Sequence, residues 1–416
     1  MNNNRLVIGI DLNNDHSLVS FCLDPSDGVK TYSREEGKDD FRIPVAAFTV
    51  PGSGNTFFGE EAVRSAEGFE MEYETGLFEK ALERAEEGNG FEESREIKIF
   101  GEFLSWLLRL VPETALSKVM ALCITVRNVN PFSGKVLNAA CSSVGIGIKN
   151  LKVMSYAESF FFYALSQPVG LWRNGVLLYD YSDTLFESAA LETDHSTTPA
   201  LVRFTRKERE GMVPFFGTDR RKLDEKFLSI VSDDIRNGVS ATYLTGEAFN
   251  ERWEQRTLRY ICTRSRVFKG QNLYSKGACY GAADMVDLIR ISRRYLYLGE
   301  ESLTVNVSVR ALSRGKEILI PVSDAGDRWY DAGDTIEVLM GHDRELIVVL
   351  TDIQDKSERN VVIRLDWLPE RPERASRIKA EFRFLSVKKL LIKVTDLGFG
   401  ELFRSTGIVR TEEVIL

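Results

Sequence analysis

The sequence contains few of the residues that build histidine- or cysteine-based sites. Only three histidines, His16, His195 and His342, occur in 416 residues, which leaves little material for a catalytic triad or a histidine-rich metal centre. The five cysteines are scattered and form no Cys-x-x-Cys pair. This usage does not match a zinc motif and is typical of a protein from a reducing cytoplasm.

Long apolar runs and an excess of positive charge are also missing. The apolar stretch at 159–165 is far shorter than the roughly 18 residues of a membrane span, and the first residues, "MNNNRLVIGIDL", lack the apolar core of a signal peptide. A net charge of -8 and a pI near 5.3 give no electrostatic attraction to nucleic acid. The sequence therefore predicts a cytoplasmic protein without a nucleic-acid or membrane partner.

The hydrophobic pattern changes once along the chain. Before about residue 290, apolar runs typical of strands alternate with runs of helical spacing, such as Ile97 to Leu110. After about Tyr295, short period-2 segments follow one another with Gly, Asp and Pro turns between them. We predict two domains, an α/β domain over 1–290 and an antiparallel β-sandwich over 296–416.

Within the first domain, the strand-like run 118–126 is apolar on both faces, as a central strand requires, and precedes a helix that ends at Gly145. The segment 151–166 repeats this order, and 176–192 has the pattern of a hairpin. The clusters of mixed charge that follow, at 203–210 and 219–226, are typical of a solvated face.

The order of these segments resembles a known fold. The motifs are "IGIDL" (8–12), "FGEEAVRSA" (58–66), "CITVRNVNPFSGKVLNAACSSVGI" (123–146), "LKVMSYAESFFFYAL" (151–165), "LLYDYSDTLFESA" (177–189) and "YLTGEAF" (243–249). Together they resemble the actin-like (ribonuclease H-like) two-lobed ATPase fold, and more narrowly the heat shock 70 kDa (DnaK) chaperone family. The β-rich remainder is similar to that family's substrate-binding sandwich.

The resemblance implies a nucleotide cleft and names its residues in this chain. In that family, two hairpins hold the phosphates through backbone N–H groups, and carboxylates hold the waters of a magnesium ion. If nucleotide binds, Asp11 and Asp180 would face magnesium, Gly246 would lie under the adenosine, and the phosphate contacts would come from Ser17, Ser182 and Thr184. Alternatively, Asp11 is a relic and Asp180 belongs to a turn held by side-chain to backbone hydrogen bonds.

The two hairpins depart from the family pattern. The first has Asp-Leu-Gly-Thr-Thr in the family but Asp-Leu-Asn-Asn-Asp at 11–15; the second has Asp-Leu-Gly-Gly-Gly-Thr but reads Asp-Tyr-Ser-Asp-Thr-Leu at 180–185. The glycines that let the backbone approach a phosphate are absent, and Asp15 and Asp183 add negative charge. Two unit charges about 4 Å apart interact by roughly 4 kcal/mol at an effective dielectric near 20.

Two further family residues are replaced. Val63 stands where the family has its catalytic lysine, with Arg64 beside it, and Tyr156 stands where it has a glutamate, with Glu158 two positions later. The interval from Asp180 to Gly246 is also short, so the subdomain that forms half of the adenine clamp is expected to be reduced. We therefore expect neither ATP nor magnesium as a cofactor and assign no catalytic residue.

Three functions remain open from the sequence. The first is a chaperone-like or scaffolding protein, a pseudo-ATPase that binds a polypeptide partner through the sandwich, whose strand edges can add an extended peptide. The second is an active, magnesium-dependent ATPase or chaperone with a non-standard pocket. The third is an actin-like subunit that assembles with its own copies. The identity of the partner and the oligomeric state do not follow from the sequence.

Overall fold

The computed structural model describes residues 6–35, 37–112, 118–209, 211–235 and 238–416. The first five residues, which the predicted first domain includes, lie outside the described residues. The chain divides into two compact units, Met1–Tyr295 and Leu296–Leu416. Among the described residues, no helix is both long and apolar enough to cross a membrane.

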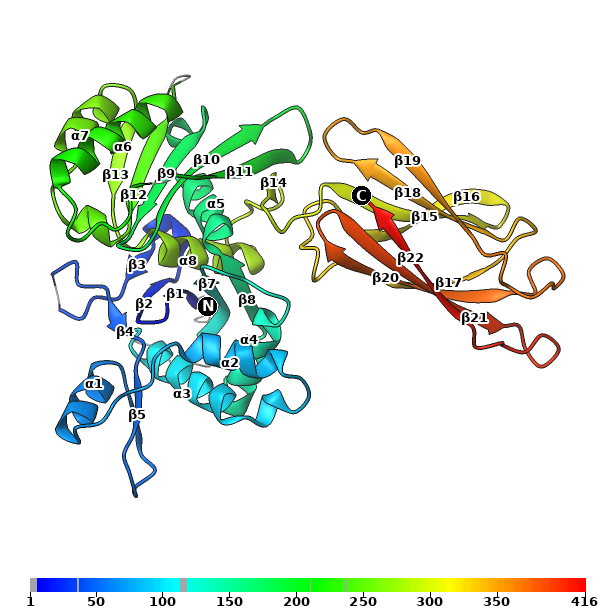
Figure 1. Cartoon of the computed structure of the whole chain (residues 1–416), viewed down its shortest axis with the longest axis horizontal. Coiled ribbons are helices and arrows are strands. Elements are labelled where there is room, and N and C mark those ends of the chain that lie inside the picture. The colour runs from blue at the N-terminus through cyan, green and yellow to red at the C-terminus, as the bar shows by residue number, and fades with distance from the viewer. Residues whose placement is uncertain (1–5, 36, 113–117, 210, 236–237) are drawn as a thin grey trace. The chain divides into compact units, whose positions relative to one another are not determined.

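The first sheet of the first unit has the strand order β3-β2-β1-β7-β8 (Figure 1). β1 pairs antiparallel with β2 and parallel with β7, and β7 pairs parallel with β8. β1 and β7 are almost entirely buried and apolar, as expected for central strands covered on both faces. The strands are β1 (Leu6–Leu12), β2 (His16–Cys22), β3 (Lys30–Thr31), β7 (Val119–Val126) and β8 (Asn150–Ser155), and β4 (Ile43–Pro44) pairs with β2.

Three helices pack with this sheet into one hydrophobic core: α2 (Leu77–Glu86), α3 (Arg95–Arg109) and α4 (Ser133–Ser143). α3 is the long helix that the apolar spacing predicts. It begins after Ser94, whose hydroxyl accepts a hydrogen bond from the Ile97 amide, a standard N-cap. A small hairpin of β5 (Ala47–Thr49) and β6 (Thr56–Phe58) and the helix α1 (Gly59–Gly68) extend from one end of the unit (Figure 1).

The second sheet repeats the connectivity of the first. Five of its strands run in the order β11-β10-β9-β12-β13, with β9 antiparallel to β10 and parallel to β12. The strands are β9 (Val176–Tyr181), β10 (Phe186–Asp194), β11 (Ala200–Glu208), β12 (Ala241–Thr245) and β13 (Arg266–Lys269).

The strand β11 was not expected from the sequence. The mixed charges at 203–210 predict a solvated face, and Arg203 and Lys207 are indeed exposed, but residues up to Glu208 also form a strand paired along its length with β10. Glu210 lies outside the described residues. Val202 and Phe204 are buried, whereas Arg203 and Thr205 are exposed. The alternation of period 2 was hidden because the outward positions carry the charges.

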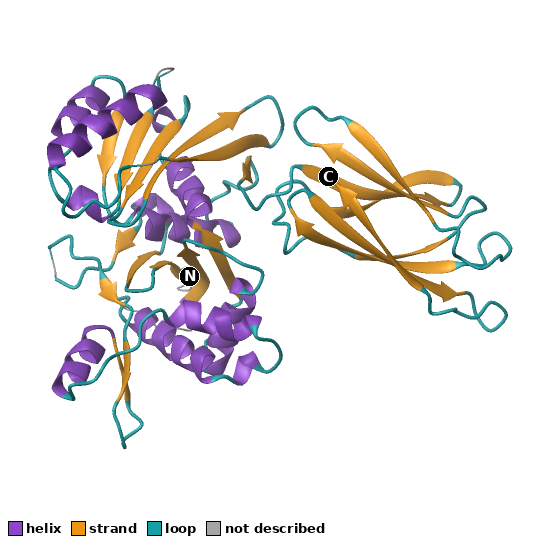
Figure 2. Cartoon of the chain, viewed as in Figure 1, coloured by secondary structure: helices purple, strands orange, loops and turns teal. Residues whose placement is uncertain are grey.

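Helices lie on both faces of the second sheet. α6 (Arg220–Asp234) and α7 (Gln255–Cys262) cover one face, while α5 (Tyr156–Ser166) and α8 (Leu273–Met285) lie between the two sheets (Figure 2). The α5 and α8 backbones approach closely at Gly277, where an added Cβ would stand 2.0 Å from the Ser159 carbonyl oxygen. Short 3₁₀ helices occupy Pro25–Asp27, Phe91–Glu93, Val169–Leu171 and Glu247–Asn250, the last being η5.

The second unit consists of two antiparallel sheets, as its period-2 pattern predicts. Their strand orders are β16-β15-β18-β19 and β17-β20-β21-β22, and one hydrophobic core joins Val307 and Val348 of the first sheet to Ile378 and Ile392 of the second. β14 (Tyr295–Leu298) lies at the boundary of the units. The other strands are β15 (Val305–Ser313), β16 (Lys316–Ser323), β17 (Thr335–Leu339), β18 (Glu345–Asp352), β19 (Glu358–Arg364), β20 (Arg377–Ser386), β21 (Lys389–Gly398) and β22 (Val409–Ile415).

Candidate functional site

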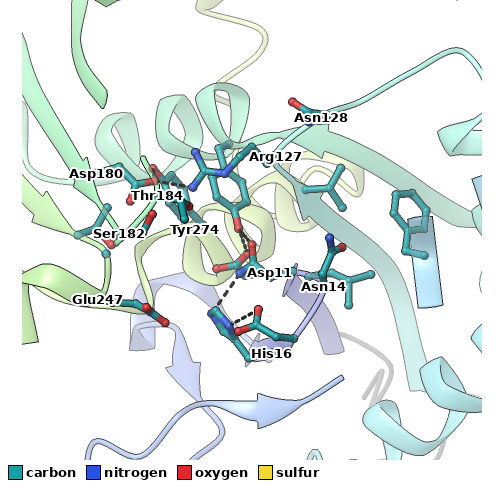
Figure 3. A pocket seen from close by; sticks show the side chains of 18 of the residues that line it. Asp11, Asn14, His16, Arg127, Asn128, Asp180, Ser182, Thr184, Glu247 and Tyr274 are labelled. Atoms are coloured by element: carbon teal, nitrogen blue, oxygen red, sulfur yellow. Dashed lines mark hydrogen bonds and ion pairs between the residues drawn. The ribbon is translucent and has the colours of Figure 1, made fainter. Parts of the chain in front are cut away.

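A cavity of about 480 Å³ opens where the carboxyl ends of β1, β7, β9 and β12 meet. Ligand sites of α/β folds commonly form at this edge of parallel strands. Five of the six predicted nucleotide-site residues line the cavity, and they come from three separate segments: Asp11, Asp180, Ser182, Thr184 and Gly246. Figure 3 labels the first four of them.

Ser17 is the predicted site residue that the structure places elsewhere. It is fully buried within β2 and is not among the residues that line the cavity. Its hydroxyl donates a hydrogen bond of 3.5 Å to the carbonyl oxygen of Ile43 in β4. In this conformation the Ser17 side chain contributes to sheet packing and does not face a phosphate position.

Asp11 lies at the base of the cavity and is held by a tyrosine. Tyr156 is the first residue after β8. Its hydroxyl oxygen lies 2.7 Å from Asp11 Oδ1 and 2.7 Å from Asn13 Oδ1. Burial raises the pKa of Asp11 to about 6, and it also raises the pKa of Tyr156 well above its usual value. The hydroxyl therefore stays protonated and donates to the carboxylate.

Asp180 forms an ion pair with Arg127. Arg127, the first residue after β7, places Nη2 3.2 Å from Asp180 Oδ2 and Nη1 2.8 Å from Glu187 Oε2. The Tyr274 hydroxyl donates to the same Asp180 oxygen at 2.9 Å. Burial disfavours the charged guanidinium, but the attraction of Asp180 outweighs it and raises the pKa of Arg127 above its ordinary value. Arg127 is thus a permanent positive charge on Asp180.

The two tyrosines connect these carboxylates. The rings of Tyr156 and Tyr274 stack with centroids 4.0 Å apart and an interplanar angle of 20°, and the Arg127 guanidinium lies 5.0 Å from the Tyr156 ring centroid. Figure 3 shows Arg127 and Tyr274 directed at Asp180, above Asp11. Each carboxylate is therefore hydrogen-bonded by a neutral hydroxyl, and the two rings that carry these hydroxyls stack on each other.

The turn after Asp180 is held by its own hydrogen bonds. The Ser182 amide donates to the Leu185 carbonyl at 2.8 Å, and Asp183 Oδ1 accepts from the Phe216 amide at 2.7 Å. The Asp183 carboxylate thus secures the segment before α6, a role that turn aspartates often have. Its charge still lies on the cavity wall.

Gly246 allows two segments to pass closely. It has a φ of +99°, and an added Cβ would stand 2.3 Å from the carbonyl oxygen of Tyr181. The Gln271 side chain also donates a hydrogen bond of 2.8 Å to the Gly246 carbonyl. The packing of β9 against the end of β12 is sufficient reason for a glycine at this position.

Negative charge predominates on the cavity wall. Two guanidinium groups, those of Arg42 and Arg127, face six carboxylates: Asp11, Asp15, Glu79, Asp180, Asp183 and Glu247. Both arginines are already paired, since Arg42 Nη1 lies 2.8 Å from Glu247 Oε1. Such a wall repels a triphosphate and attracts cations.

Glu158 and Arg64 stand nearest in sequence to the positions of the family's glutamate and lysine, but both lie outside the cavity. Glu158 pairs with Lys152, with 2.5 Å between Oε1 and Nζ, and Arg64 pairs with Glu60 on the surface of α1 at 3.0 Å. Neither they nor Val63 are among the lining residues. They therefore do not take over the positions of the family's lysine and glutamate.

Arg127, Glu187 and Tyr274 are the site residues that the sequence pattern did not reveal. Arg127 carried a usable signal, because it is the first polar side chain after a buried strand, at the edge where sites form. Tyr274, in the first turn of α8, carried none. Its role depends on the approach of a helix from 94 residues farther along the chain.

The ionisation of Asp11 leads to a testable effect on stability. Because the folded-state pKa is raised to about 6, the charged carboxylate opposes folding above that pH, and the effect disappears below its unfolded pKa near 4. We expect Asp11→Asn to raise the free energy of unfolding by about 2 kcal/mol at pH 8 and to change it little at pH 4. Two pKa units correspond to roughly 3 kcal/mol, and the new amide donor offsets part of this.

Urea titrations of the two proteins at both pH values measure this difference. Asp27→Asn is the control, because Asp27 is exposed in a 3₁₀ helix away from the cavity. If Asp11→Asn stabilises the fold equally at pH 4 and pH 8, or destabilises it at pH 8, the raised pKa assigned to Asp11 is contradicted.

Comparison with known proteins gives a family for this arrangement but no activity. Residues 302–416 match a model described as a domain of unknown function, DUF8552, and no curated protein matches the chain. Residues 28–300 match the model described as the C-terminal part of a family of unknown function, DUF5716. Since this match spans more than half of the 416 residues, the chain belongs to the DUF5716 family.

Proposed function

We propose that the first unit is an actin-like, ribonuclease H-like two-lobed domain related to that of the heat shock 70 kDa family. Its two sheets share one connectivity: each central strand, β1 or β9, is flanked by an antiparallel hairpin on one side and two parallel strands on the other. The cavity at the carboxyl ends of those strands corresponds to the family's nucleotide cleft. The short connection between β11 and α6, at 209–219, fits the expected reduction of the adenine-side subdomain.

We further propose that this cleft is a pseudo-ATPase site. The observation that carries the proposal is the Arg127 guanidinium, which pairs with Asp180 and Glu187. In the family, magnesium and phosphates lie between the two aspartates. In this chain a side chain from the first lobe supplies positive charge to the second, so the lobes are bridged without a nucleotide. Magnesium–ATP would have to break both ion pairs and bring its phosphates beside the remaining carboxylates.

The proposed role is that of a cytoplasmic chaperone-like or scaffolding protein with a polypeptide partner. The edge strand β16 supports this role. It pairs with β15 on one side, and among the described residues no strand pairs with its other edge. Ile318 and Leu319 on this strand are 40% and 47% exposed. An extended peptide with apolar side chains can add to such an edge by main-chain hydrogen bonds.

Nucleotide binding is tested by thermal unfolding. We expect the protein to have the same Tm in 5 mM Mg-ATP as in 5 mM MgCl₂ alone. A ligand present at about 100 times its Kd would stabilise the fold by roughly 2.7 kcal/mol, which corresponds to a shift of a few degrees for a unit of this size. A reproducible rise in Tm with Mg-ATP would favour the active ATPase instead, with Asp11 and Asp180 facing the metal.

Peptide capture is tested by the suppression of aggregation. We expect an equimolar amount of the protein to reduce the light scattering of a thermally denatured model enzyme, and Leu319→Lys to lose at least half of that effect. Leu339→Lys is the matched control, because Leu339 is equally exposed, at 47%, but lies on β17 of the other sheet. No suppression by the wild type, or equal loss in both variants, would contradict capture at β16.

A further inference from the structure

We propose that the cavity mouth holds a divalent metal site formed by Asp15, His16 and Glu247, with Zn²⁺ as its ion. The site is separate from the Asp11 and Asp180 positions that the family resemblance implies for magnesium. One ligand atom from each of the three side chains lies within 4.8 Å of the others. Figure 3 shows His16 and Glu247 on the same side of the cavity, below Asp11.

The ligand set determines the kind of ion. An imidazole nitrogen and carboxylate oxygens both bind Zn²⁺, at about 2.0–2.2 Å, whereas magnesium prefers oxygen ligands alone. Ligand atoms within 4.8 Å of one another can converge on one ion with small side-chain rotations. Three protein ligands leave a fourth position open, as in zinc sites that bind water or a substrate. The open position would face the cavity.

The backbone fixes the two parts of the site relative to each other. Asp15 and His16 stand where β2 begins, and the Asp15 carbonyl accepts a hydrogen bond of 2.9 Å from the Val45 amide. Glu247 is the first residue of η5, directly after Gly246 at the end of β12. The fold thus brings together residues that lie more than 230 positions apart in the sequence, each at the end of a buried strand.

The existing contacts orient the ligands and leave room for an ion. His16 Nδ1 lies 3.0 Å from Asp15 Oδ1, and Asn13 Nδ2 lies 3.1 Å from His16 Nε2. An ion replaces the proton between His16 and Asp15, and the ring then carries its proton on Nε2, which the Asn13 amide oxygen accepts after a flip. Arg42 binds Oε1 of Glu247, so Oε2 remains for the metal.

The charge of the cavity wall also favours a cation at this place. The cavity wall carries six carboxylates against two guanidinium groups, so it attracts a cation before any ligand geometry is considered.

Isothermal titration calorimetry with ZnCl₂ on the full chain, without nucleotide, tests the site. We expect one equivalent to bind to the wild type, and His16→Ala and Glu247→Gln to weaken binding at least tenfold. Glu79→Gln and His195→Ala are the controls: Glu79 lines the same cavity outside the ligand group, and His195 is one of the two other histidines in the chain. Both controls should bind like the wild type.

Thermal unfolding adds a second readout. Zn²⁺ should raise the Tm of the wild type and of both controls, and leave that of His16→Ala and Glu247→Gln unchanged. If His16→Ala does not fold, Glu247→Gln decides, because Glu247 is a partly exposed residue of η5. The proposal is overturned if the wild type binds no Zn²⁺ at 100 µM, or if Glu247→Gln binds it as tightly as the wild type. Neither result depends on whether ATP binds.

Discussion

Arg127→Leu is expected to lower the free energy of unfolding of the first unit by about 3 kcal/mol. The substitution leaves Asp180, which is 7% exposed, and Glu187, which is 16% exposed, without the cation that links them. Removal of one partner from a buried ion pair costs about 3–5 kcal/mol because the other charge stays buried. We expect the lower end of that range because a third of the Arg127 side chain is exposed.

Chemical unfolding of Arg127→Leu, followed by tryptophan fluorescence, to which Trp106, Trp172 and Trp253 of the first unit contribute, measures this loss. Arg42→Leu is the matched control. Arg42 lines the same cavity and pairs with Glu247 at 2.8 Å, but both of these side chains are about one third exposed. An exposed pair of this kind contributes roughly 0–1 kcal/mol. Equal losses in the two variants would show that Arg127 is an ordinary surface cation.

A double-mutant cycle separates the ion pair from general damage. If Arg127 acts through Asp180, then Asp180→Asn should reduce the loss caused by Arg127→Leu, with a coupling energy of about 1–3 kcal/mol. Full additivity of the two substitutions would contradict the pairing. The cycle also tests the pseudo-ATPase proposal, because an Arg127 side chain that does not bind Asp180 leaves that carboxylate free for a metal.

The arrangement of the first unit was largely predictable because its central strands and helices have strong patterns. The strand β7 is apolar at nearly every position, and α3 buries Ile97, Phe100 and Leu104 at helical spacing. These patterns depend on residues close in sequence. The strands β11 and β13 were missed, because charged residues such as Arg203, Arg266 and Lys269 occupy their exposed positions.

The site was predictable in position but not in its contacts. The resemblance to the heat shock 70 kDa family implied a shared cleft for Asp11 and Asp180, and both line the cavity. The partner of Asp180 is 53 residues away in sequence, and it depends on the exact side-by-side placement of β7 and β9. No local pattern encodes such a pairing. Ser17 shows that residue type alone does not place a side chain in the site. A serine hydroxyl suits a phosphate, but Ser17 is buried within β2.

Asp396→Asn is expected to lower the free energy of unfolding of the second unit by about 3–5 kcal/mol, the range for breaking a buried ion pair. Asp396 is fully buried at the end of β21, and its oxygens lie 2.7 Å and 2.9 Å from the two terminal nitrogens of Arg371. It also accepts hydrogen bonds from the amides of Gly398 and Thr406 and from the Thr406 hydroxyl. An amide cannot accept all of these bonds.

The same contacts predict a pH dependence. Burial alone would raise the pKa of Asp396, but the Arg371 guanidinium and the bonds from Thr406 and Gly398 outweigh it and hold the pKa well below its usual range. A depressed folded-state pKa means that the stabilisation is fully present above the unfolded pKa near 4 and is lost as the pH falls through the folded value. The wild type should therefore lose stability steeply below pH 4, and Asp396→Asn should lack this part of the slope.

Hydrogen exchange of the β20 and β21 amides, measured by mass spectrometry between pH 3 and pH 7, reports on this unit without interference from the first. Glu381→Gln is the control, because Glu381 binds Lys379 and Lys393 on the surface of the same two strands and should change protection little. Asp396→Asn should accelerate exchange throughout β20 and β21 at pH 7. If acceleration were confined to the segment near Thr406, the ion pair would order only that loop, and the core of Val394, Ile392 and Leu390 would hold the strands by itself.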